Sequence, residues 1–215
     1  MKSVLILGAG NFGSMLARQM NALGYDIMIV DVREDRINAV MPHVTDAQIG
    51  ECTNPVFLRT LGVGNYDLCV VSISENFQTS LEATSLLKEF GAKQVISRAK
   101  NEIQEKFLLR NGADEVVYPE KQIALRLATK YASEKILDFI QFDGGDPIYE
   151  MVVPTQWFGK NLRELDVRRK YNISVISLRR NGQSSIPRPD DSFQDGDVVY
   201  AVGEMKNIQK CFHIR

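Results

Sequence analysis

The chain has 215 residues, 44% of them apolar, which suits one large or two small globular domains. Its formal net charge of −1 excludes the strongly basic surface expected of a general nucleic-acid or membrane-surface binder. No apolar run reaches the ~18–20 residues of a membrane span, and the three cysteines lack paired metal-ligand spacing, so we expect a cytoplasmic protein with reduced thiols.

Residues 1 to about 133 alternate short β-branched runs with amphipathic helical stretches, a pattern typical of stacked βαβ units. Six strands are predicted, at Val4–Leu7, Ile27–Asp31, Ala47–Ile49, Leu68–Ser72, Gln94–Ser97 and Val116–Tyr118. Helices are predicted at Gly13–Leu23, Glu34–Met41, Pro55–Leu61, Phe77–Phe90, Glu102–Arg110 and Pro119 to about Ser133. These elements predict an α/β fold with a doubly wound, Rossmann-like parallel sheet.

The pattern changes after the last of these helices. A turn-rich break at 144–147 places the expected boundary near residue 138, with domains 1–137 and 138–215. In the second domain we predict strands at Tyr149–Val153, Ile173–Leu178, Ser185–Ile186 and Val198–Val202 and helices at Leu162–Tyr171 and Lys206–Cys211. Asn181-Gly182 predicts a hairpin turn, and Asn161 is a candidate helix cap. The second domain is therefore expected to be a small α+β unit.

A glycine-rich turn follows the first predicted strand. Gly8 permits a tight turn, Gly10 lets the backbone approach a pyrophosphate, and Gly13 lets the next helix pack close to the strand. The helix N-terminus then offers unpaired N–H groups to the phosphates. Asp31 follows Gly13 by 18 residues at the end of the second strand, where a carboxylate accepts hydrogen bonds from ribose hydroxyls. This combination predicts nucleotide binding.

Further candidates follow from the rule that ligands bind at the carboxyl ends of parallel strands. The segments Glu51–Thr53 and Ser72–Asn76 come after the third and fourth strands, and Arg98 comes after the fifth. Arg98 either reaches a terminal phosphate or forms a surface salt bridge. Glu120 either favours the dipole of the helix it begins or binds a divalent ion beside phosphates.

The chain lacks the acid–base constellation of a nicotinamide dehydrogenase. Its two histidines, His43 and His213, have no partner carboxylate in a recognisable arrangement, and no Tyr-x-x-x-Lys pair occurs. We therefore expect a sensor that couples nucleotide binding to a change of shape or assembly. A small NAD(P)-dependent oxidoreductase is the alternative.

Four segments carry a family resemblance. They are the run Gly8–Gly13, the ending Gly112-Ala113-Asp114-Glu115-Val116-Val117-Tyr118-Pro119-Glu120, and the later pair 159–168 and 195–203. In order along the chain, they resemble the regulator of potassium conductance (RCK) domain and its companion C-terminal domain. The nearest resemblance is to the nucleotide-binding subunit of Ktr/Trk potassium uptake systems.

The resemblance implies a gating protein that is not an enzyme. Subunits of this type pair through the helix after the sixth strand and form a homo-oligomeric ring, typically an octamer, on the cytosolic face of a membrane potassium-translocating subunit. ATP or ADP controls the ring, while some relatives prefer NAD or NADH. The residues expected to bind the nucleotide are Gly8, Gly10, Asn11, Phe12, Gly13, Asp31, Val32, Glu51, Cys52, Ser72, Ser74, Asn76 and Arg98. Glu120 matches a carboxylate that binds a divalent cation in some members.

Asn11 departs from the family pattern. Many Ktr-type subunits carry an arginine there, which reaches the γ-phosphate of the neighbouring subunit's ATP, and Asn11 is neutral and short. A charge-assisted contact of this kind is worth roughly 1.5–3 kcal/mol. We therefore predict weak discrimination between ATP and ADP, with ADP, AMP or NAD as alternative ligands.

The second domain resembles one that binds cyclic di-AMP in Gram-positive relatives. The matching segment holds Leu162, Arg168, Asn172 and Pro187. Arg168 has a guanidinium suited to a phosphate or a base. The alternative is that Arg168 belongs to a solvated basic helix face.

Overall fold

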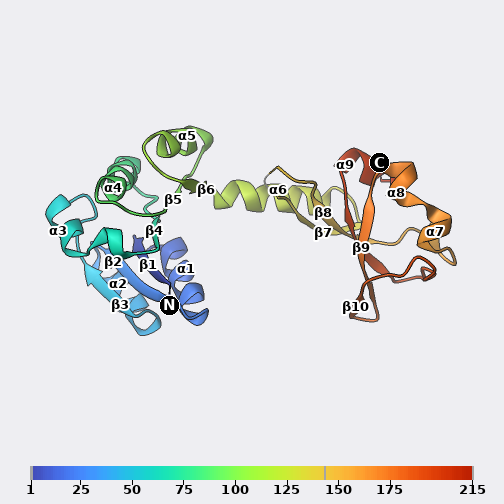
Figure 1. Ribbon diagram of the computed structural model, residues 1–215, viewed down its shortest axis with the longest axis horizontal. Helices are drawn as coiled ribbons and strands as arrows, with labels where there is room; N and C mark the ends of the chain where they lie inside the picture. The colour runs from blue at the N-terminus through green and yellow to red at the C-terminus, as the bar shows by residue number, and fades with distance from the viewer. Residues whose placement is uncertain (1, 143, 215) are drawn as a thin grey trace. The chain divides into compact units, whose positions relative to one another are not determined.

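The computed structural model describes residues 2–142 and 144–214. The chain divides into two compact units, with the division after residue 120 (Figure 1). This division lies before the boundary expected near residue 138. Helix α6 (Pro119–Tyr131) continues past the division, and its Arg126 pairs with Asp138 of β7 (Ile136–Ile140), an unpredicted strand of the second sheet.

The first unit is built on a parallel six-stranded sheet in the order β3-β2-β1-β4-β5-β6. Its strands are β1 (Ser3–Leu7), β2 (Asp26–Asp31), β3 (Asp46–Ile49), β4 (Leu68–Val71), β5 (Val95–Arg98) and β6 (Glu115–Val117). The predicted strands are confirmed to within one residue at either end. The order reverses at β1 and β4, and a ligand crevice is expected at the carboxyl ends of these two strands.

Helices cover both faces of this sheet because successive side chains of each strand point to opposite faces. They are α1 (Asn11–Ala22), α2 (Glu34–Val40), α3 (Pro55–Thr60), α4 (Phe77–Glu89) and α5 (Glu102–Arg110), with 3₁₀ turns η1 (Met41–His43) and η2 (Val63–Asn65). Val4 and Ile6 of β1 are buried with residues of α1 and α2, whereas Leu5 and Leu7 are buried with residues of α3 and α4. Within the described residues, no helix has the length and apolar character needed to cross a bilayer.

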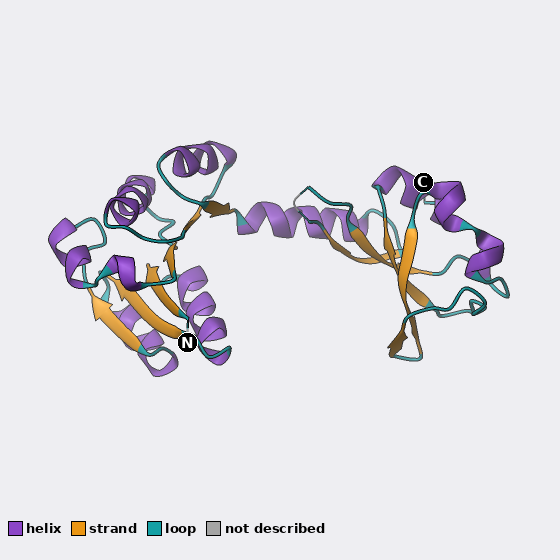
Figure 2. Ribbon diagram, in the orientation of Figure 1, coloured by secondary structure: helices purple, strands orange, loops and turns teal. Residues whose placement is uncertain are grey.

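The second unit contains an antiparallel sheet (Figure 2), and the helical segments after residue 154 pack against one face of it. The strand order is β10-β9-β11-β8-β7, formed with β8 (Ile148–Val152), β9 (Ser174–Arg180), β10 (Gln183–Ser185) and β11 (Val198–Val202). The helical segments are η3 (Thr155–Trp157), α7 (Leu162–Leu165), α8 (Val167–Tyr171) and α9 (Met205–Phe212). Tyr149, Met151, Val199 and Ala201 face these helices and form one buried core with Phe212.

Two predictions for the second unit are wrong in detail and the other local signals are confirmed. The strand predicted at Ser185–Ile186 lies at Gln183–Ser185 instead, because the two-residue turn lets the chain pair with β9 directly after Gly182. Asn181 (φ 50°) and Gly182 (φ 78°) form the predicted hairpin turn between β9 and β10. Asn161 caps α7 by accepting the backbone N–H of Glu164 at 2.9 Å. The single helix predicted over 162–171 is wrong, because Asp166 adopts a left-handed conformation (φ 47°) that separates α7 from α8.

Candidate functional site

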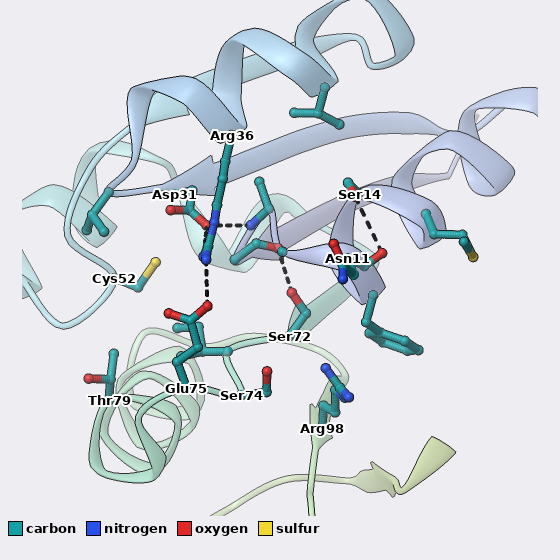
Figure 3. Close-up of a pocket in the computed structure, with 18 of the residues that line it drawn as sticks. Asn11, Ser14, Asp31, Arg36, Cys52, Ser72, Ser74, Glu75, Thr79 and Arg98 are labelled. Carbon is teal, nitrogen blue, oxygen red and sulfur yellow. Dashed lines mark hydrogen bonds and ion pairs between the residues drawn. The ribbon is translucent and has the colours of Figure 1, made fainter. Parts of the chain in front are cut away.

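A cavity of about 960 Å³ lies at the carboxyl ends of the strands of the first sheet (Figure 3). Its walls come from the segments that follow β1, β2, β3, β4 and β5, and from α1 and α2. All the predicted nucleotide-binding residues except Gly13 line it. This is the position at which a doubly wound sheet binds its ligand.

The glycine loop has two structural glycines and one that faces open space. Gly8 has a positive φ of 103°, and a Cβ on Gly13 would lie 2.0 Å from the carbonyl oxygen of Gly8. The Ser72 hydroxyl donates to that same carbonyl at 2.5 Å, which ties β4 to the loop. A Cβ on Gly10, by contrast, would meet nothing within 4 Å. Gly10 is therefore the position at which a ligand can approach the backbone.

The N-terminus of α1 opens into this cavity. Gly10 is its N-cap, and no side chain caps the helix. The first turn, which contains Asn11 and Phe12, therefore has backbone N–H groups without a side-chain partner, and the helix dipole adds partial positive charge. An anionic group such as a phosphate is the ligand that this helix end favours.

Asp31 lies at the end of β2 and is buried, with 4% of its surface exposed. Its Oδ2 accepts the backbone N–H of Ala9 at 2.7 Å, and its Oδ1 accepts that of Arg33 at 2.9 Å. Asp31 therefore joins the glycine loop to the end of β2. A carboxylate retains further acceptor sites on both oxygens, so these bonds leave capacity for ribose hydroxyls.

Arg36 and Glu75 form an ion pair at the cavity wall that the sequence analysis did not predict. The Arg36 side chain, on α2, lies between Asp31 and Glu75 (Figure 3). Its Nη1 is 3.5 Å from Asp31 Oδ2, and its Nη2 is 2.5 Å from Glu75 Oε1. Glu75 lies within the segment 72–76, which follows β4 and was expected at the ligand site. The signal for Arg36 was its place in the first turns of the helix directly after Asp31.

The remaining predicted residues on this rim have distinct environments. Cys52 is buried, and burial raises the pKa of its thiol to about 12, which keeps it neutral at pH 7. Asn76 caps α4 by accepting the backbone N–H of Gln78 at 3.0 Å, so its side chain has a structural role beside the cavity. Val32, Glu51 and Ser74 line the wall.

Arg98, at the end of β5, faces the start of α1 from the opposite side. Its guanidinium carbon is 5.4 Å from the centroid of the Phe12 ring, and its Nη2 donates to the Glu120 carboxylate. Both roles considered for Arg98 are therefore compatible with its position. The described residues contain no group of three or more His, Cys, Asp or Glu side chains arranged to hold a metal ion.

The charges around the cavity balance among the described residues. Its lining contains four basic and four acidic side chains: Arg18, Arg36, Arg98 and Lys100, and Asp31, Asp35, Glu51 and Glu75. The cavity as a whole therefore has no strong excess of positive charge for a highly charged ligand. The α1 N-terminus adds partial positive charge to this balance.

The four residues that matched the cyclic di-AMP segment occupy the helices and a loop of the second unit. Leu162 begins α7 and packs against the core, Arg168 is exposed on α8, and Asn172 ends α8 with φ 52°. Pro187 follows β10. A hollow of about 530 Å³ in this unit is lined by other residues, which include Trp157, Lys160, Lys170 and His213.

Comparisons with known proteins cover both units. Residues 4–119 match the family model of the TrkA-N domain, and residues 148–214 match that of the TrkA-C domain. The chain is 30% identical to the Ktr system potassium uptake protein C of Bacillus subtilis (strain 168), and the alignment covers 97% of this chain and 95% of that protein. It is 28% identical to the Ktr system potassium uptake protein A of the same organism, over the same shares of both chains. The solved structure of the GsuK channel bound to NAD shares the fold, with a TM-score of 0.66 and 17% identity over 99% of this chain and 39% of that one.

Proposed function

This chain belongs to the TrkA family of potassium uptake proteins, and from that premise we propose that it is a nucleotide-binding regulatory subunit of a potassium uptake system. In this proposal the first unit binds an adenine nucleotide, and binding changes the state of an assembly that controls a membrane translocating subunit. The protein then acts at the cytoplasmic face of the membrane through that partner.

One observation carries the proposal: the uncapped N-terminus of α1 and the Asp31 carboxylate lie in the walls of the same cavity. The helix end favours phosphate, and Asp31 has acceptor capacity for ribose hydroxyls. A ligand with both groups is a nucleotide.

The choice among nucleotides rests on charge. The described lining carries equal numbers of positive and negative side chains, and Asn11 is neutral. The additional negative charge of a third phosphate would therefore find little positive charge to pair with. We propose that ADP, AMP or NAD(H) binds with an affinity similar to or higher than that of ATP. The NAD bound to GsuK, a protein of the same fold, supports including NAD(H) among them.

The proposed role is regulatory and not enzymatic. The described lining of the cavity contains no histidine or tyrosine, its lysine, Lys100, is exposed to solvent, and burial keeps the Cys52 thiol neutral. A hydride-transfer site needs a group that donates or accepts a proton beside the nicotinamide. The chemistry of the lining therefore favours a sensor over the alternative, a small NAD(P)-dependent oxidoreductase.

The proposed assembly is a homo-oligomeric ring built from dimers, with eight subunits as the expected size. Helix α6 supports pairing because Ile123, Leu127 and Tyr131 are 58%, 48% and 78% exposed and lie on one face at four-residue spacing. An exposed apolar stripe of this kind is stabilised when another surface covers it.

Two further ligands remain proposals. A divalent cation at Glu120 would need acceptors from a second subunit or from the nucleotide, because Glu120 belongs to no metal-binding group within the described part of the chain. Cyclic di-AMP would bind near Leu162, Arg168, Asn172 and Pro187. If adenine nucleotides raise the melting temperature of the protein and cyclic di-AMP does not, the proposed binding of cyclic di-AMP fails.

Titration calorimetry with ATP, ADP, AMP, NAD and NADH, combined with light scattering of each mixture, tests the proposed function. We expect at least one of these nucleotides to bind and the particle mass to correspond to about eight subunits. Binding of none of them, or a monomer that oxidises a substrate with NAD(P), would overturn the regulatory proposal.

A further inference from the structure

Arg98 lies between the nucleotide cavity and the first turn of α6. It ends β5, it lines the cavity, and its side chain is 15% exposed. Its guanidinium lies over the ring of Phe12, the second residue of α1. The cation is therefore held beside the helix end that favours phosphate.

The guanidinium of Arg98 still has hydrogen-bonding capacity. Its Nη2 donates to Glu120, but its Nε is buried and has no hydrogen-bond partner among the described residues. A buried N–H without a partner costs free energy, and an anionic acceptor at this position would remove that cost. Arg98 is thus only partly satisfied by its contact with Glu120.

Glu120 depends on this contact less than Arg98 does. Its side chain is 55% exposed, and it is the second residue of α6, a position that favours a negative charge. Water and the helix N-terminus therefore still stabilise the Glu120 carboxylate when Arg98 moves away.

We propose that Arg98 exchanges partners when a nucleotide binds: its guanidinium leaves the Glu120 carboxylate and pairs with a phosphate of the ligand. Arg98 is then the residue that detects phosphate, and Glu120 is its competitor. Binding breaks an ion pair that joins β5 to the first turn of α6, so the state of α6 depends on the ligand. This inference rests on the proposed nucleotide site and assigns to it a residue pair that links the site to α6.

The exchange predicts opposite effects of two single substitutions on the affinity for ADP, measured by calorimetry in EDTA to exclude divalent cations. Glu120→Gln removes the competitor, so ADP should bind about threefold tighter or more. Arg98→Gln removes the phosphate partner, so ADP should bind about tenfold weaker or more. In the double variant the Glu120 change should have no further effect, because no guanidinium is left to release. Adenosine, which has no phosphate, should bind all variants alike.

Glu115→Gln is the matched control, because it removes the same charge from an exposed position on β6. It should leave ADP affinity at the wild-type value. The inference is overturned if Glu120→Gln leaves ADP binding unchanged or weaker in EDTA, or if it changes adenosine binding equally. Wild-type protein that binds no adenine nucleotide would overturn the proposed function as well, whereas wild-type binding without the Glu120 effect overturns the exchange alone.

Discussion

The Asp31 carboxylate accepts the backbone N–H of Ala9 at 2.7 Å, so the predicted ribose acceptor also holds the glycine loop in place. The two residues are 22 positions apart and come from the carboxyl ends of adjacent strands. The bond is buried and charge-assisted, the kind that contributes most to stability. The proposed recognition of ribose and the geometry of the loop would therefore depend on the same side chain.

Asp31→Asn should reduce both stability and nucleotide affinity. The amide nitrogen cannot accept a backbone N–H, and Arg36 loses a negatively charged neighbour. We expect the free energy of unfolding to fall by about 1–3 kcal/mol in urea titrations, together with weaker ADP binding by calorimetry. Glu34→Gln, at the exposed start of α2, is the control. It should leave ADP affinity unchanged and lower the free energy of unfolding by less than about 1 kcal/mol, because only its interaction with the helix dipole is lost. Unaltered stability of the Asp31 variant would show that the bond to Ala9 does not support the loop.

Gly10→Ala should separate binding from folding. The added methyl group meets no atom within 4 Å, and Gly10 has an ordinary φ of −67°, so the melting temperature should stay within a few degrees of wild type. ADP affinity should fall by about tenfold or more because the methyl group occupies the space of the approaching phosphate. Gly13→Ala is the contrasting variant, since its Cβ would lie 2.0 Å from the Gly8 carbonyl oxygen and should destabilise the fold. Wild-type affinity in Gly10→Ala would place the phosphates elsewhere.

The wild-type protein should distinguish ATP from ADP by less than about tenfold, because Asn11 supplies no charge for the third phosphate. Asn11→Arg should raise the preference for ATP, since a charge-assisted contact is worth roughly 1.5–3 kcal/mol. Calorimetry with both nucleotides measures the ratio, and Asn11→Gln, longer but neutral, is the control. A large preference for ATP in the wild type would contradict this account of Asn11.

The apolar stripe of α6 should be needed for assembly but not for folding. Replacing both Ile123 and Leu127 with glutamate places two charges on a surface that is already exposed, so circular dichroism should be unchanged. Light scattering should show a smaller particle than wild type, because burying an unpaired carboxylate in a subunit interface costs free energy. Gln122→Glu, also exposed on α6, tests for a simple effect of charge. An unchanged particle mass would remove the stripe from the interface.

Asp197 should make the free energy of unfolding of the second unit depend on pH in the acidic range. It is fully buried, and it accepts two bonds from Arg180 at 2.7 Å and one from the backbone of Gln194 at 2.8 Å. Burial on its own raises the pKa of this carboxyl, but the bonds from Arg180 and Gln194 outweigh that effect, and the pKa is lowered.

A lowered native pKa means that the stabilisation is complete above the unfolded-state pKa of about 3.9 and is lost as pH falls through the lower native value. Asp197→Asn should reduce the free energy of unfolding at pH 7 by about 3 kcal/mol and flatten this acid-induced loss in urea titrations between pH 7 and pH 3. Asp195→Asn, exposed in the same turn, is the control. Equal acid sensitivity of the wild type and the Asp197 variant would exclude this role.

Much of the fold was predictable because its signals are local. The glycine loop, the Asn161 cap and the turn at Asn181-Gly182 each depend on backbone conformation or hydrogen bonds within a few residues. The alternation of apolar strands and amphipathic helices likewise predicted the doubly wound sheet and most of its cavity wall. The break at Asp166 was missed because nothing in the helical pattern of 162–171 distinguishes an aspartate in the left-handed region from one in a helix.

The sequence by itself determined the parts from which the proposed nucleotide site is built, since the turn, the helix start and the acidic residue lie in one βαβ unit. Only the tertiary structure decided how that site is held and connected. The Ser72 hydroxyl reaches Gly8 across 64 residues, Arg36 reaches Glu75 across 39, and Arg98 reaches Glu120 across 22. These bonds depend on which strand ends become neighbours, because polar groups can pair only where the packing of the whole sheet brings them within about 3 Å.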